Sequence, residues 1–156
     1  MTEIKVIRQS VRATWRGGQK YDVSREGAPP ITIDGDRTAG PGPVETLLGA
    51  LAACASMDVI EYLVKRRTPA EQLEIVVDGV RRGVAPRRLL SARLTFELRG
   101  EGIEAHHAER AIALAIQTYC SVASSLAPDV VIETQLVLNG EPGTIVTQEV
   151  APVPLL

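Results

Sequence analysis

Two cysteines, Cys54 and Cys120, are the residues of this sequence best suited to chemistry. Their surroundings are alike, LAACAS around the first and TYCSVASS around the second, so small residues flank both thiols. A disulfide needs Cα atoms roughly 4.4–6.8 Å apart, and crossing helices approach that closely only where side chains are small. The pattern therefore permits a reversible thiol–disulfide pair. It also fits two small core hydrophobes, which buried cysteines commonly are.

The remaining candidates carry weaker signals. Asp58 follows Cys54 by about one helical turn, and a carboxylate there disfavours a second negative charge nearby; we interpret it as an exposed acid. His106 and His107 are the only histidines, and neighbours on a helix point about 100° apart, so they do not converge on one ion. No CxxC or HxxxH spacing, Ser/His/Asp order or phosphate loop is present. We expect surface histidines, and no metal site or cofactor.

Two long helices must position the cysteines. The first is predicted from about Pro43 to Arg67, with proline in the first turn and Lys65, Arg66 and Arg67 in the last. The second is predicted from about Glu104 to Leu126, where apolar residues recur at spacings of three and four. Each cysteine would then lie well inside a helix.

Strands fill the rest of the chain. Alternation and turn residues predict strands at 4–15, 19–25 and 31–33, a pair at about 73–77 and 92–98 joined by the basic loop RRGVAPRRLL, and a last strand at 130–138. The tail, 141–156, is either a packed arm or an ill-ordered end. The order βββ-α-ββ-α-β predicts one α+β domain over residues 1–156 with mostly antiparallel sheets, not a doubly wound fold.

Composition limits the class of protein. Apolar residues make up 45% of the 156 residues, which excludes disorder, and the net charge of −2 lacks the basic excess of a nucleic-acid binder. The N-terminus does not resemble a signal peptide, and the most apolar stretch, Thr46–Met57, is shorter than the ~20 residues that span a bilayer. We expect a soluble cytoplasmic protein that binds neither nucleic acid nor membrane. Its helices carry more apolar surface than six strands cover, so a homodimer is plausible.

The two cysteine segments resemble a known family. GPGPVETLLGALAACASMDVIEYL resembles the first helix signature of the OsmC/Ohr family, the osmotically inducible and organic hydroperoxide resistance proteins. AIALAIQTYCSVASSL resembles the second signature, and the likeness covers roughly Val11 to Gly140. MDVIEYL after Cys54 and TYCSV at Cys120 are more similar to the OsmC-like branch than to the Ohr branch.

The resemblance implies an intertwined homodimer with central helices, and a thiol peroxidase that takes part in oxidative stress defence. Cys54 would be the peroxidatic cysteine and Cys120 the resolving one. The substrate would be an organic hydroperoxide or hydrogen peroxide, and an external dithiol would reset the pair. The alternative is a non-enzymatic dimer that binds a small apolar ligand between its helices.

The sequence departs from the Ohr pattern around the cysteine. The Ohr acid lies ten residues before the first cysteine, where this chain has Val44, and the acid here is Glu45. Nine residues turn a regular helix by about 900°, which places Glu45 opposite Cys54. The Ohr arginine follows a Gly-Gly pair, whereas Gln19 follows Gly17-Gly18 here. Carried over to this sequence with these departures, the resemblance implies Glu45 as a catalytic residue. It implies Arg16, or else Arg25, as the arginine that acts on the Cys54 thiolate.

Overall fold

A computed structural model of the chain describes residues 6–153, which form two units, residues 6–47 and 48–153. The first unit contains a three-stranded antiparallel sheet in the order β1 (Arg12–Trp15), β2 (Lys20–Ser24) and β3 (Ile31–Asp34). The second contains a four-stranded sheet and the helices. Four of the five strand pairings are antiparallel, so the predicted α+β fold with mostly antiparallel sheets is confirmed.

The β1–β2 hairpin turns at the predicted Gly-Gly pair. Gly17 and Gly18 have φ angles of +93° and +55°, a region that glycine enters without steric cost. The Lys20 N–H donates to the Gly17 carbonyl at 3.1 Å and closes the turn. The prediction of a strand over 4–15 was too long: residues 6–11 are not in a strand, and residues 4 and 5 lie outside the described residues.

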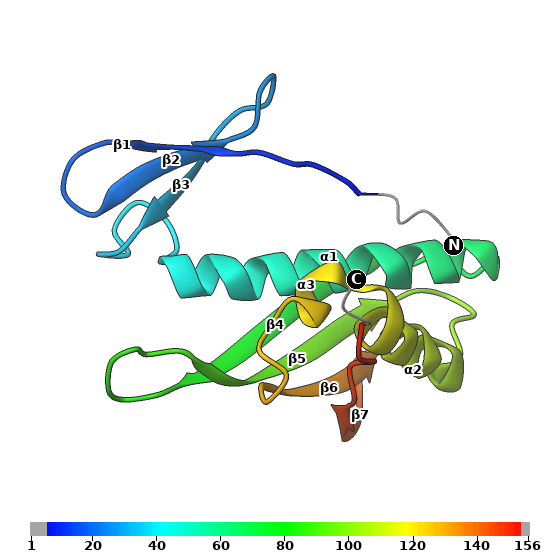
Figure 1. The fold of residues 1–156 in the computed structure, drawn as a ribbon. Coiled ribbons are helices and arrows are strands. Elements are labelled where there is room, and N and C mark those ends of the chain that lie inside the picture. Colours follow the sequence, from blue (N-terminus) through cyan, green and yellow to red (C-terminus); the bar gives the residue numbers. More distant parts are fainter. Residues whose placement is uncertain (1–5, 154–156) are drawn as a thin grey trace. The chain divides into compact units, whose positions relative to one another are not determined.

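The larger sheet has the order β4 (Gln72–Arg81), β5 (Leu89–Arg99), β6 (Val131–Leu138) and β7 (Glu141–Gln148) (Figure 1). β5 and β6 are parallel, and the helical segment between them makes the crossover that a parallel pair requires. β7 lies in the tail, where we had predicted a packed arm or an ill-ordered end. It pairs with β6 in antiparallel fashion, so residues 141–148 of the tail are a strand of the sheet, and residues 154–156 lie outside the described residues.

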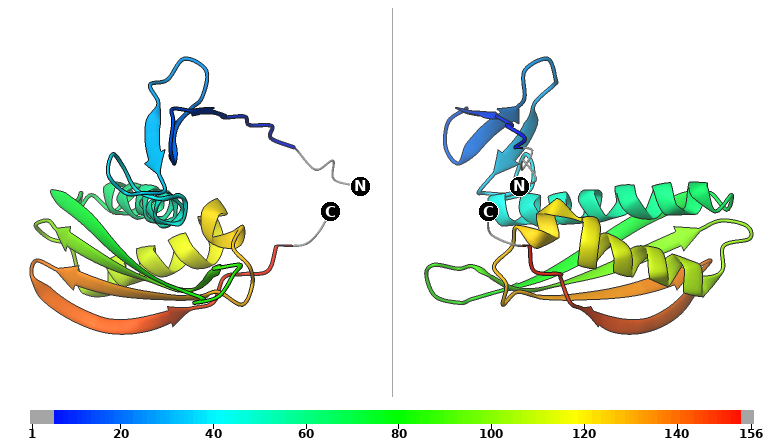
Figure 2. Two further views of the ribbon diagram at one scale, coloured as in Figure 1. Left: turned by 90° about the vertical axis from the view of Figure 1, so that its left-hand side faces the viewer. Right: turned by 45° about the vertical axis from the view of Figure 1, so that its right-hand side comes forward.

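The first long helix, α1 (Pro43–Lys65), confirms the prediction to within two residues. It ends where Arg67 adopts a φ of +61°. In the second unit it lies on the same face of the large sheet as α2 (Ala105–Leu114), as both views of Figure 2 show. A row of residues spaced by four faces the core: Leu51, Ala55, Val59 and Leu63.

The second long helix is interrupted, and its prediction as one helix over 104–126 was wrong. α2 passes into a π-helical turn, η1 (Ala115–Tyr119), and after Cys120 a four-residue helix, α3 (Ser121–Ser124), follows. The Cys120 N–H reaches back five residues to the Ala115 carbonyl at 2.7 Å. Cys120 itself has an extended ψ of 104°, so it lies at a helix junction rather than inside a helix.

The core lies between the helices and the inner face of the large sheet. β5 supplies its centre through the predicted alternation, with Leu94 and Phe96 fully buried. Among the described helices, only α1 is long and apolar enough to cross a membrane, by length and composition alone. Only 22% of its most apolar window is buried, so α1 carries a large apolar surface beyond its core-facing row. The apolar helix is thus longer than the stretch Thr46–Met57 on which the expectation of no membrane span rested, although one such helix is weak evidence for a span.

Candidate active site

Cys120 is held at the junction between η1 and α3. Its side chain is 2% exposed, and its sulfur accepts a hydrogen bond from the Ala123 N–H at 3.3 Å. Burial, and to a smaller extent hydrogen bonding and charge from the neighbouring Cys54 thiol, raise the pKa of Cys120 to about 11. The Ala123 N–H opposes the shift in part. Cys120 is therefore a protonated thiol at neutral pH.

Cys54 lies in the middle of α1 and is partly buried against the core. The next residue along the helix, the small Ala55, is fully buried in the core. Both cysteines are free thiols. The structure thus brings Cys54 and Cys120 together, the more accessible thiol on the continuous helix and the buried thiol at the junction.

Glu45 has a structural partner that the sequence reasoning missed. Its carboxylate accepts the Gly42 N–H at 2.7 Å, as the acid of a helix capping box does, and it pairs with Arg37 at 2.7 Å. Arg16, the arginine chosen from the sequence, instead pairs with Asp22 at 2.7 Å within its own sheet. Arg25 follows β2 in a turn. The structure therefore pairs Glu45 with Arg37, and Arg16 with a different acid.

Arg37 is presented by a loop that Asp34 organises. The buried Asp34 carboxylate accepts hydrogen bonds from the backbone N–H groups of Asp36, Thr38 and Ala39 and from the Thr38 hydroxyl, at 2.8–3.0 Å. Burial alone would raise the pKa of Asp34, but these bonds, led by that of the Thr38 hydroxyl, lower it to about 2. The sequence signal was an aspartate opening the loop GDRTAGPGP, because aspartate bonds readily to the backbone of a following turn.

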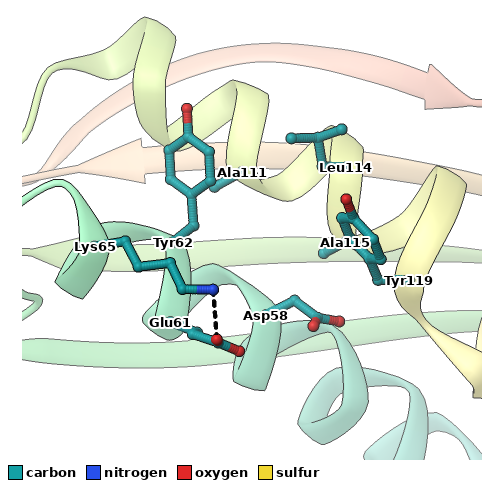
Figure 3. A pocket seen from close by; sticks show the side chains of 8 residues that line it. All are labelled: Asp58, Glu61, Tyr62, Lys65, Ala111, Leu114, Ala115 and Tyr119. Carbon is teal, nitrogen blue, oxygen red and sulfur yellow. Dashed lines mark ion pairs between the residues drawn. The ribbon is translucent and has the colours of Figure 1, made fainter.

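Asp58 lines a pocket of about 410 Å³ between α1 and the α2–η1 segment, rather than standing on an open surface. Figure 3 shows Tyr62 beside Ala111 on one side of this pocket and Tyr119 beside Ala115 on the other. Lys65 extends toward Glu61, and its ammonium lies 2.6 Å from the carboxylate. Neither cysteine lines the pocket, but Asp58 follows Cys54 by one helical turn and Tyr119 directly precedes Cys120.

The two histidines begin α2. His106 is exposed, and Nε2 of the half-buried His107 contacts the Arg66 guanidinium. Desolvation and the Arg66 charge lower the pKa of His107, so this imidazole is neutral at pH 7. Among residues 6–153, the one group of three metal-ligand types within 4.8 Å is Glu104 with these two histidines, and neither cysteine belongs to it. The arginine charge beside His107 opposes a bound cation there.

Comparison with known proteins decides the family. The sequence model of the family described as OsmC-like protein matches residues 34–135, well over half of the chain. This chain belongs to the OsmC-like family. It is similar to Protein YhfA of Escherichia coli K12, with 30% identity over 116 residues that cover 74% of this chain and 87% of YhfA.

Solved structures of this family share the fold. An OsmC-like protein from Mycoplasma pneumoniae aligns with a TM-score of 0.73 at 18% identity, covering 85% of this chain and 97% of that one. The organic hydroperoxide resistance protein OhrB of Bacillus subtilis aligns with a TM-score of 0.55 at 14% identity, covering 82% and 98%. Both alignments show that this chain shares its fold with these proteins.

Proposed function

We propose that this protein is a thiol peroxidase that reduces an organic hydroperoxide or hydrogen peroxide through Cys54 and Cys120. The observation that carries the proposal is the nearness of these two thiols: they come from distant parts of the chain and differ in burial, and Cys54 lies close enough to raise the pKa of Cys120. Similarity to proteins named for organic hydroperoxide resistance supports the same chemistry. We place this activity in the cytoplasm and in oxidative stress defence.

The difference between the thiols assigns their roles. Cys54 is the more accessible sulfur, and its thiolate attacks the terminal oxygen of the peroxide. The S–O bond forms while the O–O bond breaks, and the departing alkoxide takes a proton and leaves as an alcohol. Cys54 is then a sulfenic acid, oxidised by two electrons, and the peroxide is reduced by two.

Cys120 completes the cycle as the resolving thiol. Because its pKa is raised to about 11, it stays protonated and unreactive toward peroxide at neutral pH. When its sulfur attacks the sulfenic sulfur, the S–S bond forms, the S–O bond breaks, and the Cys120 proton leaves with the hydroxyl as water. An external dithiol then reduces the disulfide by thiol–disulfide exchange, and is itself oxidised to a disulfide.

The proposal is tested by thiol counting and mass measurement. One equivalent of cumene hydroperoxide is expected to remove both thiols and to form one intramolecular disulfide. Cys120→Ser should trap Cys54 as a sulfenic acid that reacts with dimedone, whereas Cys54→Ser should leave Cys120 untouched. Two intact thiols after excess peroxide would end the peroxidase proposal and favour the dimer that binds a small apolar ligand.

Glu45 and Arg16 stay predictions as catalytic residues, with Arg25 as the second candidate and the Glu45 partner Arg37 as a third. An arginine stays protonated and can hydrogen-bond a thiolate or a peroxide oxygen. Replacing the acting arginine with Met should slow alkylation of Cys54 at pH 7 about tenfold or more, since each tenfold step corresponds to about 1.4 kcal/mol. Arg93→Met on the outer sheet face, where Arg93 pairs with Glu133, is the matched control.

We propose that the protein works as a homodimer. A second apolar stripe on α1 points away from its core-facing row, and Met57 and Val64 within it are 69% and 56% exposed. A helix that is apolar on most of its surface is normally buried on most of its surface. Light scattering should report about twice the chain mass of 16.7 kDa, and a monomer at micromolar concentration would contradict this assembly.

A further inference from the structure

The pocket beside the cysteines is large enough for an organic molecule. Its volume of about 410 Å³ falls within the range of roughly 300–1,000 Å³ that small-molecule sites occupy. Neither sulfur lines it, but two of its lining residues are near the cysteines along the chain: Asp58 is one helical turn after Cys54, and Tyr119 directly precedes Cys120 (Figure 3). This makes the pocket the candidate position for the rest of a peroxide molecule that reacts at Cys54.

The floor of the pocket is apolar. Ala111 and Ala115 are buried, Leu114 is half-buried, and the two tyrosine rings stand on either side of them. Such a surface favours a hydrocarbon or aromatic group, because contact with it removes apolar area from water. The floor alone gives no preference for the charge of the bound molecule.

The α1 wall of the pocket carries a net negative charge. Lys65 and Glu61 form an ion pair. Lys65 lowers the pKa of Glu61 and Glu61 raises the pKa of Lys65, so both side chains are charged at neutral pH. The lysine charge is thereby neutralised locally. Within residues 6–153, Asp58 has no cation at ion-pair distance, so its carboxylate leaves the wall with one uncompensated negative charge.

Given the proposed peroxidase function, we propose that this pocket selects substrates by charge and that Asp58 is the residue that determines this selectivity. Neutral and cationic organic hydroperoxides are accepted, and hydroperoxides that carry a carboxylate are disfavoured. Repulsion between like charges a few ångströms apart near a protein surface corresponds to about a tenfold difference in binding or more. Because the pocket is open to water, salt screens this difference.

Three substrates with one reacting group isolate the effect: cumene hydroperoxide, its para-carboxylate and its para-aminomethyl derivative. The wild-type protein should give kcat/KM values in the order ammonium, neutral, carboxylate, with about tenfold between the two charged substrates. This ratio should shrink toward one in 1 M salt. Equal kcat/KM values for all three substrates would overturn the proposal while leaving the peroxidase function in place.

Asp58→Asn tests the residue itself. It should reduce the ratio of kcat/KM between the ammonium and carboxylate substrates several-fold. Any change that it makes to the reactivity of Cys54 affects all three substrates equally and cancels in this ratio. Glu97→Gln on the exposed outer face of β5 removes the same charge outside the pocket, and it should leave the ratio unchanged. An unchanged ratio in Asp58→Asn, or an equal drop in Glu97→Gln, would contradict the assignment.

Binding without chemistry separates the two proposals. In a variant that carries both Cys54→Ser and Cys120→Ser, the three corresponding cumyl alcohols can be titrated by tyrosine fluorescence. If the alcohols bind in the order ammonium, neutral, carboxylate while the wild-type protein consumes no peroxide, that result would support charge selection by the pocket and reject the peroxidase function. Binding of none of the alcohols, or of all three with equal affinity, would reject the pocket as the source of selectivity.

Discussion

The two units of the chain are stabilised in different ways. The second unit contains a continuous core of nineteen buried apolar residues, drawn from both sides of the helix–sheet interface. Within the three strands of the first unit, Asp34 is the one buried residue, and Trp15 and Ile31 are 63% and 57% exposed. The large unit is thus held by packing, and the small sheet by turns, hydrogen bonds and ion pairs. A small sheet without a buried apolar face is marginal alone, which fits the proposed dimer.

The largest contrast is expected from truncating one apolar side chain in each unit. Phe96→Ala removes a fully buried ring and should lower the free energy of unfolding by about 3–5 kcal/mol. Ile31→Ala, at an exposed position, should change it by less than about 1 kcal/mol in a lone chain. Urea denaturation followed by circular dichroism measures both.

The same pair of variants tests what covers the small sheet. If a second copy buries Ile31, the cost of Ile31→Ala rises and depends on protein concentration, whereas the cost of Phe96→Ala does not. A small, concentration-independent effect at Ile31 would leave the small sheet without a partner.

A smaller loss is expected at Gly40 in the loop after β3. A Cβ atom there would clash with the Thr32 carbonyl oxygen, which belongs to the backbone and cannot turn aside. Gly40→Ala should therefore destabilise the protein by about 1–3 kcal/mol. Gly49→Ala in α1 is the matched control, because no atom beyond the adjacent residues and backbone of its own helix lies within 4 Å of the added methyl group, and alanine favours a helix by about 1 kcal/mol. Equal effects at the two glycines would contradict the close backbone approach.

The smallest and most local effect is expected from acid. The pKa of Asp34 is about 2 in the folded protein against an ordinary value of 3.8, so its contribution to stability is complete above pH 3.8 and is lost as pH falls toward 2. The fluorescence of Trp15, the single tryptophan, should report loosening of the first unit over this range. Asp34→Asn should shift this change to higher pH or abolish it, and Asp36→Asn should not.

The fold could be predicted where one face of an element is buried. In β5 apolar and polar residues alternate, and in α1 apolar residues recur every four positions, so the buried face of each element can be predicted from its sequence. The break at Cys120 could not be predicted in this way, since Ile116 and Ala123 keep helical spacing on either side of it. A π-helical turn adds a residue to the helix while apolar residues still face the core. β7 was hidden by Pro142 and Gly143, which are rare in strand interiors.

The candidate site also has a part that could be predicted from the sequence and a part that could not. The cysteine pair could be predicted from small neighbours and from the family likeness, because both depend on local sequence. The Arg37–Glu45 pair could not, because it depends on how the loop after Asp34 folds, and a loop carries no periodic pattern. Asp58 was interpreted as an exposed acid for a related reason. One side of its pocket is formed in part by η1, whose path cannot be predicted from residue spacing.

The junction at Cys120 separates this residue from the regular helix before it. A residue inside a continuous helix moves only if the hydrogen bonds on both sides of it break together. Cys120 lies between the π-helical turn and α3 and has an extended ψ of 104°, so no continuous α-helical series of hydrogen bonds runs through it. A disulfide formed at this residue therefore strains the short junction and not the regular turns of α2 or the core row of α1.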